Sequence, residues 1–139
     1  MNRGLILLVE DNEDDELLTL MALKDARIVN PVAVARDGQA AIDYLSSQHN
    51  EVPAVILLDL NLPKVSGLEV LTWARHQPRT RLVPVVCLTS SKQESDVVAG
   101  YAEGCNSYIC KPVEFSEFSR AVGQLGMYWM MMNEAAPRV

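Results

Sequence analysis

The sequence predicts an α/β protein in which five helices cover a doubly wound, five-stranded parallel sheet. Short apolar runs alternate with amphipathic segments along the chain. The apolar runs are continuous rather than alternating, which is typical of strands buried on both faces. Strict alternation of strands and helices favours a parallel sheet with helices on both sides. The 139 residues suit one domain with a sizeable core.

Each element follows from a local pattern. The expected strands, in order, are residues 5–9 (LILLV), 32–35 (VAVA), 54–59 (AVILLD), 83–89 (VPVVCLT) and 107–110 (SYIC). The expected helices are 14–26, 38–47, 67–75, 93–103 and 114–129, where apolar residues recur at helical spacing. Pro31 and Pro53 precede the second and third strands, Pro78 lies in the connection to the fourth strand, and Pro84 lies where that connection meets the fourth strand. The prolines therefore interrupt no predicted helix.

Composition excludes several classes of function. A formal charge of −6 argues against broad binding to nucleic acid or to an anionic membrane surface. The N-terminus shows no signal-peptide pattern, and no apolar run approaches the roughly 20 residues of a membrane span. The three cysteines are odd in number and lack CxxC spacing, which predicts buried free thiols in a reducing compartment. We therefore expect a cytoplasmic protein.

The residues that directly follow the strands form a candidate site, because ligands of open α/β sheets bind at the carboxyl ends of the strands. They are Glu10, Asp11, Asp59, Thr89, Ser90, Ser91 and Lys111. Clustered carboxylates repel one another unless a cation offsets them, and oxygen ligands suit Mg²⁺. A lysine beside a hydroxyl can hold phosphoryl oxygens. The set predicts a site that receives a phosphoryl group on a carboxylate.

The acidic run after the first strand divides into two parts. Glu10 and Asp11 belong to the carboxyl edge of the sheet, whereas residues 13–16 (EDDE) occupy the first turn of the next helix. Negative charge is favoured there by the helix dipole. Asn12 separates the two groups.

Four motifs carry a resemblance to a known family. They are VED at 9–11, LLDLNLPKVSG at 57–67, LTSS at 88–91 and YICKP at 108–112. In this order and spacing, they resemble the receiver domain, the phosphoacceptor module of two-component response regulators. The resemblance covers about residues 4–126 and implies a flavodoxin-like fold with strand order 2-1-3-4-5.

The resemblance also implies a role for each site residue. Asp59 is the expected phosphoryl acceptor. Asp11 and Asp59 are expected to bind Mg²⁺ directly, Glu10 through water, and Asn61 through its main-chain carbonyl, with Mn²⁺ able to substitute. Thr89 and Lys111 are expected to contact the phosphoryl group, and Tyr108 to follow Thr89 as an aromatic switch. Two backbone features are also expected. Pro112 should follow a cis peptide bond, and Gly67 should close the turn after the third strand at positive φ.

Several alternatives remain open from the residues alone. Tyr108 could serve only as a packing residue, and Ser90 and Ser91 as caps of the following helix. A phosphatase of the haloacid-dehalogenase type is disfavoured, because it would need an aspartate at position 61, where this chain has Asn61, and a cap insertion. A flavin binder is excluded, because it would need a phosphate-binding loop after the first strand, where the acids would repel the phosphate. A degenerate receiver that acts without phosphorylation is the remaining alternative.

The expected activity is phosphoryl transfer from a sensor histidine kinase to Asp59, without enzymatic activity beyond self-phosphotransfer and autodephosphorylation. Residues 1–126 form the expected receiver domain, and 127–139 a C-terminal helix extension and tail without an output domain. The extension contains the end of LGMYWMMM (125–132), which reads either as a core helix or as an interaction surface. It resembles stand-alone receivers paired with phytochrome-type kinases. We expect signalling by protein binding or by a homodimer through the fourth helix, fifth strand, fifth helix and extension.

Overall fold

A computed structural model describes residues 4–89, 104–111 and 115–121 of the chain. Five strands form one parallel sheet in the order β2-β1-β3-β4-β5. They are β1 (Ile6–Val9), β2 (Val32–Ala35), β3 (Val55–Asp59), β4 (Val85–Thr89) and β5 (Ser107–Cys110). The predicted fold class, strand order and parallel pairing are therefore confirmed.

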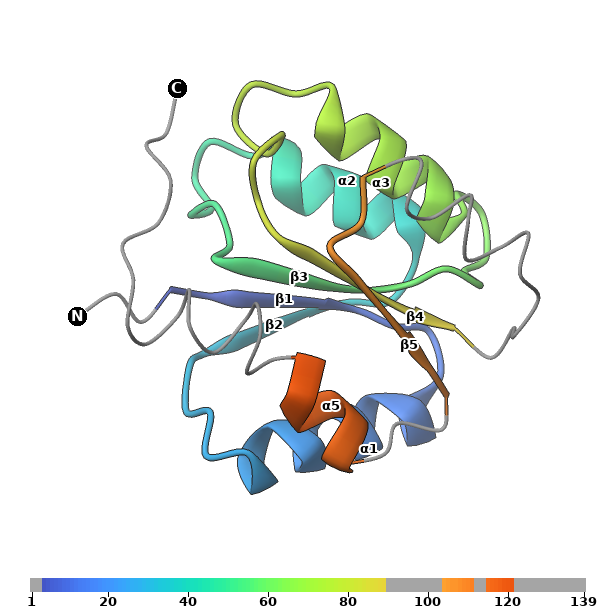
Figure 1. The fold of residues 1–139 in the computed structure, drawn as a ribbon. Coiled ribbons are helices and arrows are strands. Elements are labelled where there is room, and N and C mark those ends of the chain that lie inside the picture. The colour runs from blue at the N-terminus through green and yellow to red at the C-terminus, as the bar shows by residue number, and fades with distance from the viewer. Residues whose placement is uncertain (1–3, 90–103, 112–114, 122–139) are drawn as a thin grey trace.

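Helices cover both faces of the sheet. In the described residues they are α1 (Glu13–Asp25), α2 (Gly38–Ser46), α3 (Gly67–Arg75) and α5 (Phe115–Ala121). Figure 1 shows α1 and α5 on one face and α2 and α3 on the other. No helix in this part of the chain is long and apolar enough to cross a membrane.

Some predictions lie outside the described residues. These are the helix at 93–103, the capping roles of Ser90 and Ser91, the cis bond before Pro112, and the C-terminal extension at 127–139. Most of the predicted dimer surface also belongs to these segments.

Alternating side chains of the strands divide the core into two layers, because successive residues of a strand point to opposite faces. Ile6 and Leu8 of β1 pack toward the α1 and α5 side, together with the buried ring of Phe118. Leu7 and Val9 pack toward α2 and α3, together with Leu71. All four β1 residues are fully buried, which explains why the first strand is a continuous apolar run.

The two edge strands differ from the central ones. Residues 32–34 of β2 are half-buried and only Ala35 is buried, and β5 has one buried residue, Ile109. The sequence predicted full burial for all five strands. An edge strand is covered by only one neighbour, so its apolar side chains remain partly accessible.

The fourth strand begins two residues later than predicted, at Val85. Pro84 has no N–H for a ladder bond, but its carbonyl accepts a hydrogen bond from the main-chain N–H of Ile56 at 3.0 Å. Among the cysteines, Cys87 and Cys105 are buried and Cys110 is half-buried. None of the three forms a disulfide, as predicted.

Candidate functional site

The parallel register brings the predicted site residues to one edge of the sheet. Val9 pairs with Leu58, and Asp59 pairs with Leu88, so the ends of β1, β3 and β4 are level. Thr89 ends β4, and its carbonyl accepts a hydrogen bond from the main-chain N–H of Lys111 at 2.7 Å. Residues far apart in the chain therefore meet at the carboxyl ends of the strands.

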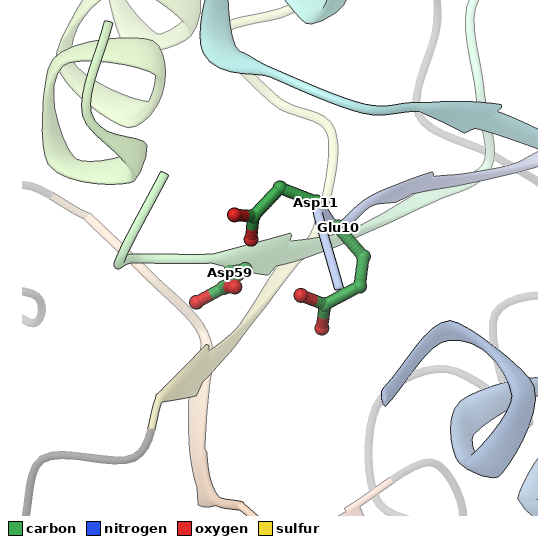
Figure 2. A group of neighbouring side chains, drawn as sticks. All are labelled: Glu10, Asp11 and Asp59. Carbon is green, nitrogen blue, oxygen red and sulfur yellow. The ribbon is translucent and has the colours of Figure 1, made fainter. Parts of the chain in front are cut away.

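Three carboxylates gather at this edge. Glu10 is fully buried, Asp59 is 1% exposed and Asp11 is exposed. One oxygen from each lies within 4.8 Å of the others. Figure 2 shows Glu10 and Asp11 beyond the end of β1, facing Asp59 on β3. A compact set of oxygen donors, two of them buried, fits a hard divalent cation such as Mg²⁺ or Mn²⁺.

The Lys111 ammonium lies among the carboxylates. Its Nζ donates to both Glu10 oxygens at 3.1 Å and to Asp59 Oδ2 at 3.0 Å. It also donates to Asp15 Oδ2 at 2.8 Å. The Lys111 side chain is only 8% exposed, so these interactions replace its hydration.

Burial and charge shift the pKa values of this group in the directions that their surroundings predict. Burial, followed by hydrogen bonding to Asp59 and repulsion from it, raises the pKa of Glu10 to about 8. Burial alone would lower the pKa of Lys111, but its hydrogen bonds to Asp15 and Asp59 and the nearby negative charge raise it above its ordinary value. Lys111 thus remains a cation at neutral pH.

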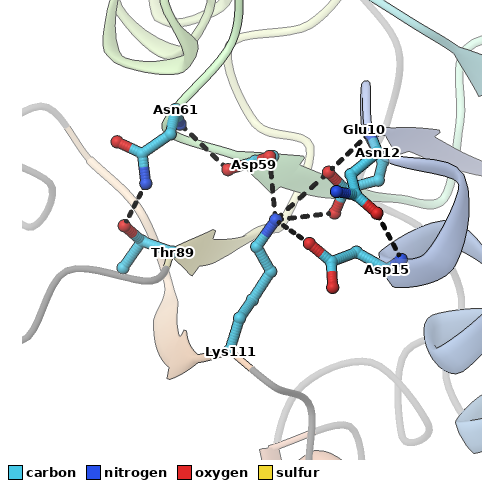
Figure 3. Close-up of polar contacts among 7 residues, drawn as sticks. All are labelled: Glu10, Asn12, Asp15, Asp59, Asn61, Thr89 and Lys111. Carbon is cyan, nitrogen blue, oxygen red and sulfur yellow. Dashed lines mark hydrogen bonds and ion pairs between the residues drawn. The ribbon is translucent and has the colours of Figure 1, made fainter.

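Asn61 links Asp59 to Thr89. Its main-chain N–H donates to Asp59 Oδ1 at 2.9 Å, and its side-chain amide donates to Thr89 Oγ1 at 2.9 Å. Figure 3 shows Asn61 and Thr89 on one side of Asp59, with Glu10 and Asp15 on the other. The sequence pointed only to the main-chain carbonyl of Asn61, so this contact of its side chain with the predicted switch hydroxyl is new.

Tyr108 lies in the middle of β5, level with Cys87. Its half-buried side chain packs against the core layer on the α2 and α3 side. Packing and switching are both compatible with this location, so the role of Tyr108 as an aromatic switch stays a prediction.

Two glycines lie very close to the backbone of β3 and of the loop that follows it. A Cβ added to Gly67 would lie 2.1 Å from the carbonyl oxygen of Asp59, and one added to Gly38 would lie 1.9 Å from that of Val65. The prediction that Gly67 adopts positive φ was wrong: the residue with positive φ in this loop is Lys64, at 65°. Gly67 is needed because the start of α3 approaches the backbone of β3, not because of its own torsion angle.

Asp15 is the site residue that sequence reasoning missed. It was assigned to the first turn of a helix, which is correct, but its side chain turns back to Lys111. The signal in the sequence was Asn12, a favourable N-cap residue, which predicts a helix beginning at residue 13. That start places residue 15 in the turn nearest the end of β1.

Comparison with known proteins supports one family. The family model of the response regulator receiver domain matches residues 6–123. The response regulator Rcp1 of Synechocystis sp. is 38% identical over 129 residues, which cover 90% of this chain and 88% of Rcp1. The probable methanogenesis regulatory protein FilR2 of Methanothrix harundinacea is also 38% identical, over 94% of this chain and 86% of FilR2.

Solved structures show the same relationship. The bacteriophytochrome response regulator RtBRR is 50% identical with a TM-score of 0.82, covering 96% of this chain and 84% of its own. The Mn²⁺-bound form of Rcp1 is 36% identical with a TM-score of 0.80, covering 96% and 99%. Together with the sheet order and the acidic edge, these matches show that the chain belongs to the response regulator receiver domain family and is related to phytochrome response regulators.

Proposed function

We propose that Asp59 accepts a phosphoryl group from the phosphohistidine of a sensor histidine kinase, in a reaction that depends on Mg²⁺. The observation that carries this proposal is the position of Asp59. Its buried carboxylate lies between two acidic side chains suited to a cation and an ammonium 3.0 Å away. An anionic nucleophile can accept an anionic phosphoryl group only where cationic groups offset the repulsion.

In the proposed reaction, a carboxylate oxygen of Asp59 attacks phosphorus, and the bond between phosphorus and the histidine nitrogen breaks. The products are an aspartyl phosphate and a histidine that takes up a proton from solvent. Lys111 binds a phosphoryl oxygen through its ammonium, and the Thr89 hydroxyl donates to another after leaving the Asn61 amide.

Glu10, Asp11 and Asp59 would hold the cation, with the Asn61 carbonyl as a further ligand. When bound, Mg²⁺ neutralises charge between the Asp59 carboxylate and the incoming phosphoryl group. The Mn²⁺-bound form of Rcp1 supports a divalent cation in this family, and we propose Mg²⁺ as the ion here with Mn²⁺ as a substitute.

The similarity to bacteriophytochrome response regulators supports a phytochrome-type kinase as the partner. We further propose that phosphorylation shifts the population of two packings of Thr89 and Tyr108 and thereby alters a protein-binding or dimer surface. On this proposal the protein acts in the cytoplasm and catalyses no reaction beyond its own phosphorylation and dephosphorylation.

Intact-mass measurement after incubation with acetyl phosphate and MgCl₂ tests the proposed phosphorylation. Wild type should gain the mass of one phosphoryl group, and Asp59→Asn should gain none. Asp25→Asn is the matched control, because Asp25 is an exposed aspartate at the far end of α1 and should be phosphorylated normally. EDTA should prevent the gain in every variant. A wild type that stays unmodified, or an Asp59→Asn variant that is modified, would overturn the proposal.

A further inference from the structure

We propose that Asp15 is a positioning residue for Lys111, which holds the ammonium on the α1 side of the site and limits its competition with a divalent cation for Glu10 and Asp59. The inference rests on the cation site of the proposed function and extends it to a residue outside the three-carboxylate group. The inference rests on the ion pair between Asp15 and Lys111, which lie 96 positions apart in the chain.

The contact between Asp15 and Lys111 is the shortest that the ammonium makes with the residues that the structure describes. Asp15 Oδ2 lies 2.8 Å from Nζ, compared with 3.0 Å for Asp59 and 3.1 Å for each Glu10 oxygen. Glu10 and Asp59 belong to the group whose oxygens could hold a metal, whereas Asp15 does not. The Asp15 carboxylate therefore attracts the lysine without being a candidate ligand of the cation.

The start of α1 fixes the location of Asp15. Asn12 caps the helix: its side-chain oxygen accepts from the Asp15 N–H at 3.0 Å, and its carbonyl accepts from the Glu16 N–H at 2.9 Å. The first turn of a helix also stabilises an anion. The Asp15 side chain is 26% exposed, so the pair with the nearly buried Lys111 is partly shielded from water. The start of α1 thus holds the Asp15 side chain beside the lysine.

The way in which Lys111 distributes its N–H donors determines how strongly it competes with a divalent cation for carboxylate oxygens. An ammonium has three N–H donors, and Lys111 distributes them over three carboxylates. If the Asp15 carboxylate is removed by substitution, the donors concentrate on Glu10 and Asp59, whose oxygens the divalent cation also needs. Two cations that share these oxygens repel each other, so the divalent cation binds more weakly.

Titration with Mn²⁺, with free Mn²⁺ measured by electron paramagnetic resonance, tests this role without requiring phosphorylation. Asp15→Asn should weaken binding by about fivefold, within the range for charged groups in direct contact. Asp14→Asn removes the same charge one residue away; Asp14 is exposed and is not among the ion-pair partners of Lys111 in the described residues. It should weaken binding by less than about twofold, because an exposed charge is screened. Asp15→Glu, which keeps a carboxylate within reach, should bind within about twofold of wild type.

Repeating the titration in a Lys111→Met background shows whether Asp15 acts through the lysine. In the Lys111→Met background, Asp15→Asn should weaken Mn²⁺ binding no more than Asp14→Asn does, because only the long-range effect of losing one negative charge remains. The inference is overturned if Asp15→Asn matches Asp14→Asn in the native background, or if its fivefold effect persists without Lys111.

Failure of this inference is distinguishable from failure of the proposed function. If wild type gains a phosphoryl group while Asp15→Asn binds Mn²⁺ as Asp14→Asn does, only the inference is overturned. If wild type binds Mn²⁺ with the expected dependence on Asp15 but gains no phosphoryl group, only the proposed phosphorylation is overturned.

Discussion

Replacing Gly67 with alanine would test how closely the start of α3 must approach the phosphoacceptor strand. The new Cβ would lie 2.1 Å from the Asp59 carbonyl oxygen and 2.5 Å from Leu60 Cα, whereas Cβ atoms essentially never approach another heavy atom within 3.0 Å. Both neighbours are backbone atoms, so rotation of a side chain cannot relieve the clash. The end of β3 and the start of α3 must separate by about 0.9 Å, the difference between 3.0 and 2.1 Å.

A displacement of that size has two measurable costs. Overpacking costs about 1–3 kcal/mol, and alanine returns up to about 1 kcal/mol through its better helix propensity, so we expect a net loss of about 1–2 kcal/mol of unfolding free energy. The Asp59 carboxylate, which lies 3.0 Å from the Lys111 ammonium, would also be displaced from its position in the site. Because misplacement by about 1 Å can reduce a rate a hundredfold, phosphorylation should slow by at least about tenfold.

Urea denaturation and the rate of phosphorylation by acetyl phosphate would measure the two effects. Gly38→Ala is the matched control, because its Cβ would meet the Val65 carbonyl oxygen at 1.9 Å and not the strand that carries Asp59. The control should lose similar stability but retain a rate within a few-fold of wild type. A Gly67→Ala protein with unchanged stability and rate would refute the argument from close approach. Equal slowing of both variants would show that the clash with Asp59 is not what matters.

Two further predictions concern Glu10 and Arg75. The folded-state pKa of Glu10, about 8, exceeds its ordinary 4.5. Its contribution to stability is therefore full below pH 4.5 and falls by up to about 1.4 kcal/mol per pH unit as pH rises toward 8 without Mg²⁺. Chemical denaturation from pH 5 to 8 should show this decline relative to Glu10→Gln, and Mg²⁺ should reverse it; parallel curves would refute the shift. Arg75 donates to the carbonyls of Gly104 at 2.7 Å and Val83 at 2.7 Å. Arg75→Met should lower the free energy of unfolding, measured by urea denaturation, by about 3 kcal/mol, because these carbonyls lose their donors. Replacing the exposed Arg81 with methionine should lower it by less than about 0.5 kcal/mol. Equal losses would contradict a stabilising role of the Arg75 hydrogen bonds.

The fold was predictable because its signals are local. A fully buried central strand such as β1 must be a continuous apolar run, and Asn12 identifies a helix start within a few residues. The main error concerned β2, whose apolar side chains are half-buried. Its residues resemble those of a central strand, so the local pattern alone does not show that it lies at an edge; that information comes from the strand order, which the family resemblance implied.

The sequence was sufficient to predict those site residues that directly follow a strand. Residues at the carboxyl ends of parallel strands share one edge of the sheet, so the positions of the strands along the chain suffice to group Glu10, Asp59 and Lys111. The rule does not apply to a side chain on a helix. Whether Asp15 points to solvent or to Lys111 depends on the direction in which α1 leaves β1, and the same composition would suit either orientation.

The local sequence was enough to predict the alternation of strands and helices, the parallel sheet and the acidic edge with Lys111, since these depend on side-chain spacing and on the residues at the end of each strand. The folded arrangement shows which partners these groups take. Lys111 donates to Glu10, Asp15 and Asp59, and the Asn61 amide donates to Thr89. The folded arrangement also shows that Gly67 is needed for the close approach of α3 to β3, and not for a positive φ. The physical reason is range, because these contacts join atoms a few ångströms apart on elements whose relative placement comes from packing of the whole core.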